Sequence, residues 1–295
     1  MKIAVFNDHR VGVVEDLQLY DVTAAFPEFL QDLPQQRINW LISHWGNMQG
    51  ALLAARSAAA AKPLAGVTLL AANPAPGHVF AAPTNYRKHM GELGDRAVSK
   101  TGRSAREQGF FLMAPGSLIG AGQSLVVPKD SPRRFDHESE LAVIVGRGGR
   151  NIPRERAMEH VFGYACLIDA TMRIEPGIAE EERSMRKSFE SFTPLGPFLV
   201  TADEVLNPSA LQNRLWVNGE LRQQANTADM VVGIEELIEL ISSVLPISPG
   251  DVIATGTPDG VGPFQAGDRV KIEIESVGSM ELPVRELAEK APRAY

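Results

Sequence analysis

The sequence is poor in cysteine, and its basic residues are outnumbered by acidic ones. Cys166 is the only cysteine among 295 residues, so no disulfide can form within the chain and a reducing cytoplasm is the expected compartment. Lys and Arg number 29 against 36 Asp and Glu, which gives a formal net charge of -7. A general nucleic-acid binder needs a basic surface to meet phosphates, so this balance argues against a nucleic-acid partner.

Long apolar runs are also missing. No stretch approaches the roughly 18 to 20 consecutive apolar residues of a transmembrane helix, so we expect no membrane partner. The opening MKIAVFNDHRVG has no basic region followed by an apolar core, and we therefore expect no signal peptide. Hydrophobic residues still make up 44% of the chain, which is enough for the sizeable core of a soluble globular protein.

Short strand-like segments punctuated by glycine and proline dominate the chain after about residue 70. Asn218-Gly219 between two such segments predicts a hairpin turn. Helical patterns are fewer, with clear examples in PRERAMEHV and GIEELIELISSV. We therefore predict a β-rich α+β fold, with a small N-terminal α/β domain at residues 1–70 and a main domain at residues 71–295.

Acidic residues alternate at the start of an apolar stretch in RRFDHESELAVIVG, where Asp136, Glu138 and Glu140 would share one strand face. Like charges that close disfavour ionisation unless a cation intervenes, and all-oxygen ligation suits Mg²⁺, Mn²⁺ or Ca²⁺. Asp169 ends the apolar strand YACLI, where an unpaired charge is costly. It could complete a metal site with Glu138 and Glu140. The alternative is a solvated strand end with harmless surface acids.

Five motifs in collinear order resemble the fumarylacetoacetate hydrolase family. They are HVFAAPTNYRKHMGE, FDHESELAVIVG, GYACLIDATMR, RKSFESFTPLGPFLVT and ISPGDVIATGTPDGVG, and they span roughly residues 75–285. The resemblance implies a catalytic domain built as a mixed β-roll, preceded by a variable leading domain. It also implies a homodimer with Mg²⁺ or Mn²⁺ in the active site, with Ca²⁺ possible in a crystal.

The resemblance assigns catalytic roles position by position. The carboxylates of Glu138, Glu140 and Asp169 match the family's metal ligands. His89 and Glu92, in HMGE, match a His-x-x-Glu pair that activates water, since residues three apart on a helix lie one turn apart. Lys187, in RKSF, matches a lysine beside the metal that can stabilise a developing oxyanion or enolate.

Four further positions are implied as substrate contacts. Arg173 matches an arginine near the acidic end of the substrate. Thr257, preceded by Gly256 in the loop GTPDGVG, matches a position where hydroxyl and backbone N–H groups hold a carboxylate or keto oxygen. Tyr86 either lines the pocket or packs into the core.

Other positions near these motifs receive structural interpretations or depart from the family pattern. His137 falls on the opposite strand face from the acids and Asp136 lies one step outward, so both are interpreted as structural. Ile174 and Pro176 replace an acid and a glutamine that usually follow the metal-binding aspartate. The polar, glycine-punctuated segment 91–109 is either a surface loop or a lid over the substrate.

The expected function is metal-dependent hydrolysis of a C–C bond in a 2,4-dioxo acid such as an acylpyruvate or fumarylpyruvate, through an enolate that the metal stabilises. Without water attack, the same enolate would support keto–enol isomerisation or decarboxylation of a 2-oxo dioate in aromatic-compound catabolism. A non-catalytic protein with a structural Ca²⁺ is a third possibility. Lys187 and the His89–Glu92 pair argue against it, because a structural site needs neither. The small-molecule partner would be a 2-oxo or 1,3-diketo acid.

Overall fold

The computed structural model describes residues 1–30, 33–93, 103–175, 177 and 181–290, without the side chains at positions 30, 92 and 93. Its main sheet has 11 strands in the order β4-β3-β2-β1-β13-β11-β10-β16-β5-β6, with β7 paired to β13. A three-stranded sheet, β12-β9-β17, and a five-stranded sheet, β15-β14-β18-β19-β8, complete the fold. The predicted β-rich α+β class is therefore confirmed.

The strands are short, as the spacing of glycine and proline predicted. Their bounds are β1 Lys2–Phe6, β2 Arg10–Glu15, β3 Gln18–Asp21, β4 Ala61–Pro63, β5 Val79–Ala81, β6 Phe111–Met113, β7 Leu118–Ile119, β8 Leu125–Val127, β9 Phe135–His137, β10 Ser139–Val145, β11 Val161–Ile168, β12 Thr171–Met172, β13 Thr193–Thr201, β14 Gln212–Val217, β15 Glu220–Asn226, β16 Val252–Ala254, β17 Gly262–Phe264, β18 Arg269–Ile274 and β19 Gly278–Glu286. Asn218 and Gly219 both have positive φ between β14 and β15, so the predicted hairpin is present.

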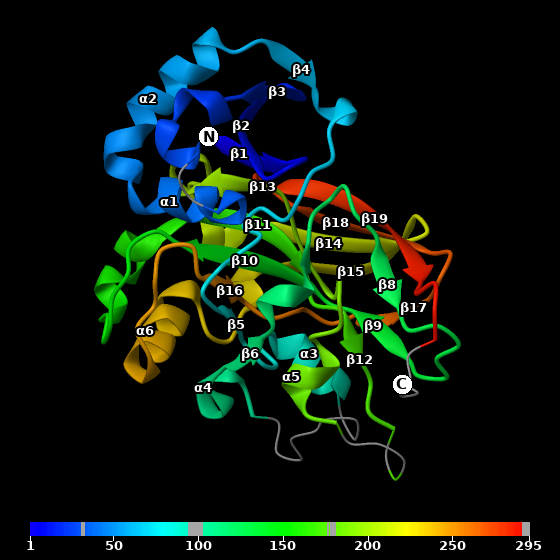
Figure 1. Cartoon of the computed structure of the whole chain (residues 1–295). Coiled ribbons are helices and arrows are strands. Elements are labelled where there is room, and N and C mark those ends of the chain that lie inside the picture. The colour runs from blue at the N-terminus through cyan, green and yellow to red at the C-terminus, as the bar shows by residue number, and fades with distance from the viewer. Residues whose placement is uncertain (31–32, 94–102, 176, 178–180, 291–295) are drawn as a thin grey trace.

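Helices gather at the two ends of the molecule (Figure 1). The helices are α1 Arg37–Ser43, α2 Trp45–Ala58, α3 Arg87–Leu93, α4 Ala105–Gln108, α5 Arg183–Arg186 and α6 Ile234–Val244, with the 3-10 helix η7 at Arg154–His160. In Figure 1, α1 and α2 lie at the top beside β1 to β4, whereas α3, α4 and α5 gather at the bottom. None of the described helices is both long and apolar enough to cross a membrane.

Strand β10 is buried on both faces, which explains its unbroken apolar sequence. Leu141 and Val143 belong to one hydrophobic cluster of the core, and Ala142 and Ile144 belong to the other. Residues two apart in a strand share a face, so the face that carries Ala142 and Ile144 continues towards the start of β10 to Glu140. The packed strand thus gives a rigid base to the acidic residues.

The N-terminal segment extends the main sheet. β1 pairs antiparallel with β13, where Lys2 lies opposite Val200 and Ile3 opposite Leu199. Phe29, Leu41 and Leu52 share a hydrophobic cluster with the β10 residues Ala142 and Ile144. The division into domains at residue 70 stays a prediction, and the two parts share both a sheet and a core.

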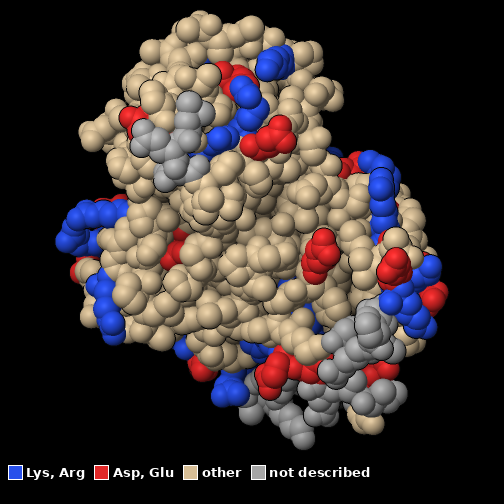
Figure 2. Space-filling model, viewed as in Figure 1, with Lys and Arg blue, Asp and Glu red and all other residues tan. Residues whose placement is uncertain are grey.

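Charged side chains of both signs are scattered over the face in Figure 2. Lys and Arg side chains lie mainly towards the rim of this face, near Asp and Glu, around a broad area drawn in tan. Ion pairs such as Arg214–Glu273 and Arg222–Glu220 are exposed on the surface, where such pairs contribute little to stability. Stability therefore depends mainly on the two apolar clusters.

The packing around β11 predicts a large effect of truncating Leu167, which is fully buried opposite Glu140. Leu167→Ala should lower the free energy of unfolding by about 2 to 5 kcal/mol, because it leaves a cavity in the core. Urea denaturation measures this change. The control Leu206→Ala removes a side chain that is 95% exposed and should stay within about 0.5 kcal/mol of the original protein. Equal effects of the two substitutions would contradict this packing.

Candidate metal centre and active site

Three carboxylates meet where β10 begins and β11 ends. In the antiparallel ladder Glu140 lies opposite Leu167, and the backbone N–H of Asp169 donates to the carbonyl oxygen of Glu138 at 2.9 Å. Glu138 and Asp169 are therefore cross-strand neighbours on the face that carries Glu140. One ligand oxygen from each residue lies within 4.8 Å of the others, and all three residues are buried. The two glutamates spaced two apart, Glu138 and Glu140, thus lie close to Asp169 at the strand end, as the sequence predicted.

Lys187 places a positive charge between two of these carboxylates. Its Nζ donates to Glu138 Oε2 at 2.9 Å, to Thr171 Oγ1 at 2.7 Å and, in a short hydrogen bond, to Asp169 Oδ2. These bonds engage all three N–H donors of the ammonium group. The side chain is also buried, so Lys187 fixes the orientation of two carboxylates and offsets part of their charge.

Arg173 joins Glu138 to Asp136. Its Nη2 donates to Glu138 Oε1 at 2.7 Å and its Nε donates to Asp136 Oδ2 at 2.7 Å. Asp136 also accepts from Arg134 Nε at 2.6 Å. Asp136 therefore supports the site from outside, in line with its structural interpretation. Arg173, predicted as a substrate contact, has two guanidinium nitrogens committed to carboxylates and orients Glu138.

The surroundings give the three carboxyl groups different pKa values. Burial opposes the charge of Glu138, but the cations of Lys187 and Arg173 outweigh it and hold the pKa of Glu138 well below its usual range. Burial raises the pKa of Asp169 to about 6, although Lys187 acts in the opposite direction. Burial and the charges of Asp169 and Glu138 raise the pKa of Glu140 well above its usual range. Asp169 and Glu140 therefore tend to hold protons, because the cations of the site do not balance three ionised carboxylates.

A divalent cation fits the donor atoms that remain. Asp169 Oδ1 is buried and has no hydrogen-bond partner among the residues that the structure describes. A buried carboxylate oxygen without a partner is costly, and carboxylate oxygens are the ligands that Mg²⁺ and Mn²⁺ prefer. The residues present would accordingly hold such an ion through Glu138, Glu140 and Asp169.

Helix α3 carries His89 within electrostatic range of Glu138. The His89 side chain is 5% exposed, and a positive charge on it lies near enough to Glu138 to help lower the pKa of that carboxyl. The side chain of Glu92, three residues further along the same helix, lies outside the described residues. His89 is therefore buried within electrostatic range of Glu138, and both its catalytic role and its pairing with Glu92 stay predictions.

The loop after β16 supports Glu140. Gly256 donates its backbone N–H to Glu140 Oε2 at 2.7 Å. Its φ of 94° is one that residues with a Cβ rarely adopt, and a Cβ there would lie 2.6 Å from the Cβ of Asn85. Thr257 Oγ1 accepts from Gln223 Nε2 at 2.9 Å. Of the two predicted substrate contacts in this loop, Gly256 therefore orients the Glu140 carboxylate, and the Thr257 hydroxyl is held by Gln223.

Tyr86 and His137 are both buried in the protein. Tyr86 is 1% exposed and belongs to a hydrophobic cluster of the core. Burial and the nearby charge of Glu140 raise its pKa, so the ring packs into the core while lying close to the site. His137 Nδ1 is 3.1 Å from Gln223 Oε1, and burial lowers the pKa of the imidazole. This is the structural placement that the strand alternation predicted.

Two polar residues at the site were not identified from the sequence. Gln223 Oε1 also accepts the backbone N–H of Ser139 at 3.0 Å, and its Nε2 donates to the carbonyl oxygen of Pro258 at 3.0 Å. It reaches the site from β15, and no local motif marks it. Thr171, which accepts from Lys187, follows Asp169 at a spacing of two, and that spacing was a usable signal.

The polar segment 91–109 is described only in part, because residues 94–102 lie outside the description. Ser104 and Glu107 form a capping box at the start of α4. Arg106 then makes two hydrogen bonds to the Glu236 carboxylate of α6, at 2.5 and 2.8 Å. The end of the segment is thereby tied to α6, and the two alternatives for the segment, a surface loop or a lid, both stay predictions.

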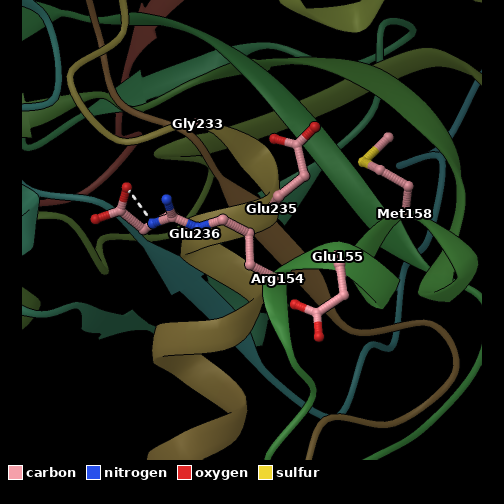
Figure 3. Close-up of a pocket in the computed structure, with 6 residues that line it drawn as sticks. All are labelled: Arg154, Glu155, Met158, Gly233, Glu235 and Glu236. Carbon is pink, nitrogen blue, oxygen red and sulfur yellow. Dashed lines mark ion pairs between the residues drawn. The ribbon is translucent and has the colours of Figure 1, made fainter.

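Glu236 also contributes to a surface pocket of about 420 Å³ between η7 and the start of α6 (Figure 3). Arg154 Nη2 lies 2.5 Å from Glu236 Oε2, the contact drawn as a dashed line in Figure 3. None of the predicted site residues lines this pocket. Because Glu236 binds both Arg106 and Arg154, this group holds α4, α6 and η7 together.

The sequence matches a known family over most of its length. The profile of the fumarylacetoacetate (FAA) hydrolase C-terminal domain matches residues 78–285, which contain all three carboxylates, His89, Arg173, Lys187 and Thr257. The protein belongs to the fumarylacetoacetate hydrolase family.

Relatives within the family cover nearly the whole chain. Maleylpyruvate hydrolase of Aquipseudomonas alcaligenes is 43% identical over 293 residues, covering 97% of this chain and 99% of that protein. The crystal structure of maleylpyruvate hydrolase from Sphingobium sp. SYK-6 in complex with manganese(II) ion and pyruvate has a TM-score of 0.85 and 39% identity, covering 97% of this chain and 99% of that one. A probable 2-hydroxyhepta-2,4-diene-1,7-dioate isomerase from Mycobacterium abscessus has a TM-score of 0.79 and 27% identity, with 98% and 99% coverage.

Because the three carboxylates are crowded, replacing Glu140 with Gln should change both the metal affinity and the stability of this member of the fumarylacetoacetate hydrolase family. Loss of one ligand should weaken Mn²⁺ binding by at least about 10- to 100-fold in a calorimetric titration, since even supporting residues of metal sites have effects of that size. The metal-free variant should be no less stable in thermal unfolding, because a disfavoured buried charge has been removed. Glu220→Gln, a change at an exposed glutamate, is the control. Unchanged Mn²⁺ affinity in Glu140→Gln would contradict the ligand assignment.

The raised pKa of Asp169, about 6, predicts the pH dependence of metal binding. Below that pH the carboxyl group carries a proton that Mn²⁺ must displace, so the affinity should fall as the pH falls through 6, by about tenfold per pH unit for each proton displaced. Calorimetry in buffers of different ionisation enthalpy measures the protons released. An affinity that stays constant from about pH 5 to pH 7, without proton release, would count against this site.

Proposed function

We propose that this protein is a divalent-metal-dependent hydrolase that cleaves the C–C bond between the two oxo-bearing halves of a 2,4-dioxo acid of the maleylpyruvate type. The observation that carries the proposal is the meeting of Glu138, Glu140 and Asp169 with Lys187 and His89 in one buried site. The 43% identity to a maleylpyruvate hydrolase over nearly the full length supports the same substrate class.

The bound ion and His89 have different roles in the proposed reaction. A bound Mg²⁺ or Mn²⁺ supplies Lewis-acid polarisation of the 2-oxo acid group. His89 takes a proton from a water molecule, whose oxygen then adds to the carbonyl at carbon 4. The bond between carbons 3 and 4 breaks, carbon 4 leaves as a carboxylic acid, and the electron pair stays on carbon 3 as the enolate of pyruvate. Protonation of carbon 3 yields pyruvate.

Lys187 has an electrostatic role in this scheme. Its three N–H groups already bind Glu138, Asp169 and Thr171, so it is held at the carboxylates as a fixed positive charge. Such a preorganised charge stabilises the negative charge that develops as the C–C bond breaks. A purely structural Ca²⁺ site would have no use for this cation.

Isomerisation is the second candidate function. The likeness to a probable 2-hydroxyhepta-2,4-diene-1,7-dioate isomerase over nearly the whole chain favours it. Isomerisation needs the enolate and a proton relay but no attack by water. Analysis of the products therefore distinguishes isomerisation from hydrolysis.

The location and assembly of the protein belong to the same proposal. We propose a cytoplasmic homodimer, with the leading residues 1–70 as a small domain before the catalytic domain. The single buried cysteine suits a reducing compartment, and the dimer follows from the family resemblance. Light scattering on the purified protein separates a monomer from a dimer.

Replacing His89 tests the activation of water. His89→Ala should lower kcat for maleylpyruvate cleavage by roughly 10²- to 10⁴-fold, the usual contribution of a general base, and should leave Mn²⁺ affinity near that of the original protein. Loss of enol absorbance in the ultraviolet measures cleavage. His44→Ala changes a histidine that stacks on Trp40 away from the site and serves as the control. Full activity in His89→Ala would remove His89 from the mechanism.

A further inference from the structure

Arg183, the first residue of α5, extends beside the proposed active site. Its side chain is half-buried, and its Cζ lies 5.3 Å from the centroid of the Phe111 ring. Lys187 Nζ lies 5.6 Å from the centroid of the same ring. These two distances place the guanidinium within about 11 Å of the Lys187 ammonium, which itself binds Glu138 and Asp169.

The other arginines around the site are occupied by protein oxygens. Arg173 binds Asp136 and Glu138, and Arg133 binds Glu181. Arg186 donates to backbone carbonyl oxygens of residues 181 and 172. Each of these side chains is therefore committed to holding the protein together.

Arg183 differs from those arginines in its contacts. Within the described part of the chain it forms no ion pair, and its hydrogen bond is to a neutral amide, from Nη2 to Gln108 Oε1 at 3.2 Å. Burial lowers its pKa, while the charges of Glu138, Asp169 and Glu182 oppose that change, so the guanidinium lies within electrostatic range of the carboxylate site. A half-buried cation without a carboxylate is costly, and a guanidinium is well shaped to bind one in two places.

We propose that Arg183 binds the carboxylate at the far end of the substrate and selects dicarboxylic 2,4-dioxo acids over monocarboxylic ones. This inference rests on the proposed function. A dioxo diacid with its 2-oxo acid end at Glu138, Glu140 and Asp169 places its far carboxylate on the order of 5 to 8 Å away, by ordinary bond lengths. That reach falls within the separation that the Phe111 contacts allow, and the Phe111 ring, which both cations approach, would pack against the unsaturated chain.

Two substrates that differ at the far end test the inference by catalysis. With Mn²⁺ present, Arg183→Gln should lower kcat/KM for maleylpyruvate by about 10- to 150-fold, mostly through KM, as expected for loss of a hydrogen-bonded charge pair. Cleavage of acetylpyruvate, which has no far carboxylate, should fall by less than about threefold. Arg183→Lys should recover part of the loss, because the charge remains.

Binding of unreactive acids tests the inference without catalysis. The protein loaded with Mn²⁺ should bind 2-oxoadipate more tightly than 2-oxohexanoate, which has the same chain length and lacks the far carboxylate, and calorimetry should show that Arg183→Gln abolishes this preference. Arg154→Gln removes an equal charge from the surface, where Arg154 is 51% exposed, and should change neither measurement.

Two results would overturn the role of Arg183. One is an equal loss on both substrates in Arg183→Gln, which would show that the residue supports Lys187 or Phe111 structurally. The other is a preference for 2-oxoadipate that survives in Arg183→Gln. If the original protein cleaves neither dioxo acid, the proposed function fails, and the binding preference still decides the role of Arg183.

Discussion

Mutual repulsion among three buried carboxylates is the constraint around which this protein is organised. Glu138 and Asp169 face each other across β10 and β11, with Glu140 on the same face. Burial alone would drive such groups to hold protons. Lys187 and Arg173 keep Glu138 ionised, whereas burial and the neighbouring carboxylates raise the pKa values of Asp169 and Glu140. A divalent ion would replace the protons that these groups tend to hold and balance the charge of three ionised carboxylates.

The remainder of the site holds these carboxylates in place. Lys187 and Arg173 share the oxygens of Glu138, and Gly256 donates its N–H to Glu140 at a backbone angle that suits glycine. Behind them, β10 is packed between two apolar clusters. Rigid strands position side chains more accurately than loops do, while His89 comes from α3 and Lys187 from the position directly after α5.

The sequence predicted those features that depend on local periodicity or turn chemistry. A spacing of two placed Glu138 and Glu140 on one face, and Asn218-Gly219 marked a hairpin. Contacts between distant segments left no local pattern. The pairing of β1 with β13 joins residues about 200 positions apart, and a lone arginine such as Arg183 looks like any surface cation until Phe111 and Lys187 are placed beside it.

The location of the metal is the central claim, and anomalous scattering from a crystal of the protein soaked in Mn²⁺ tests it most directly. We expect one strong anomalous peak with oxygens of Glu138, Glu140 and Asp169 within about 2.5 Å of it, the range of hard-cation oxygen ligation. Lys187 should remain bonded beside it. A fully active protein whose crystals show Mn²⁺ elsewhere, with these carboxylates uncoordinated, would contradict the account.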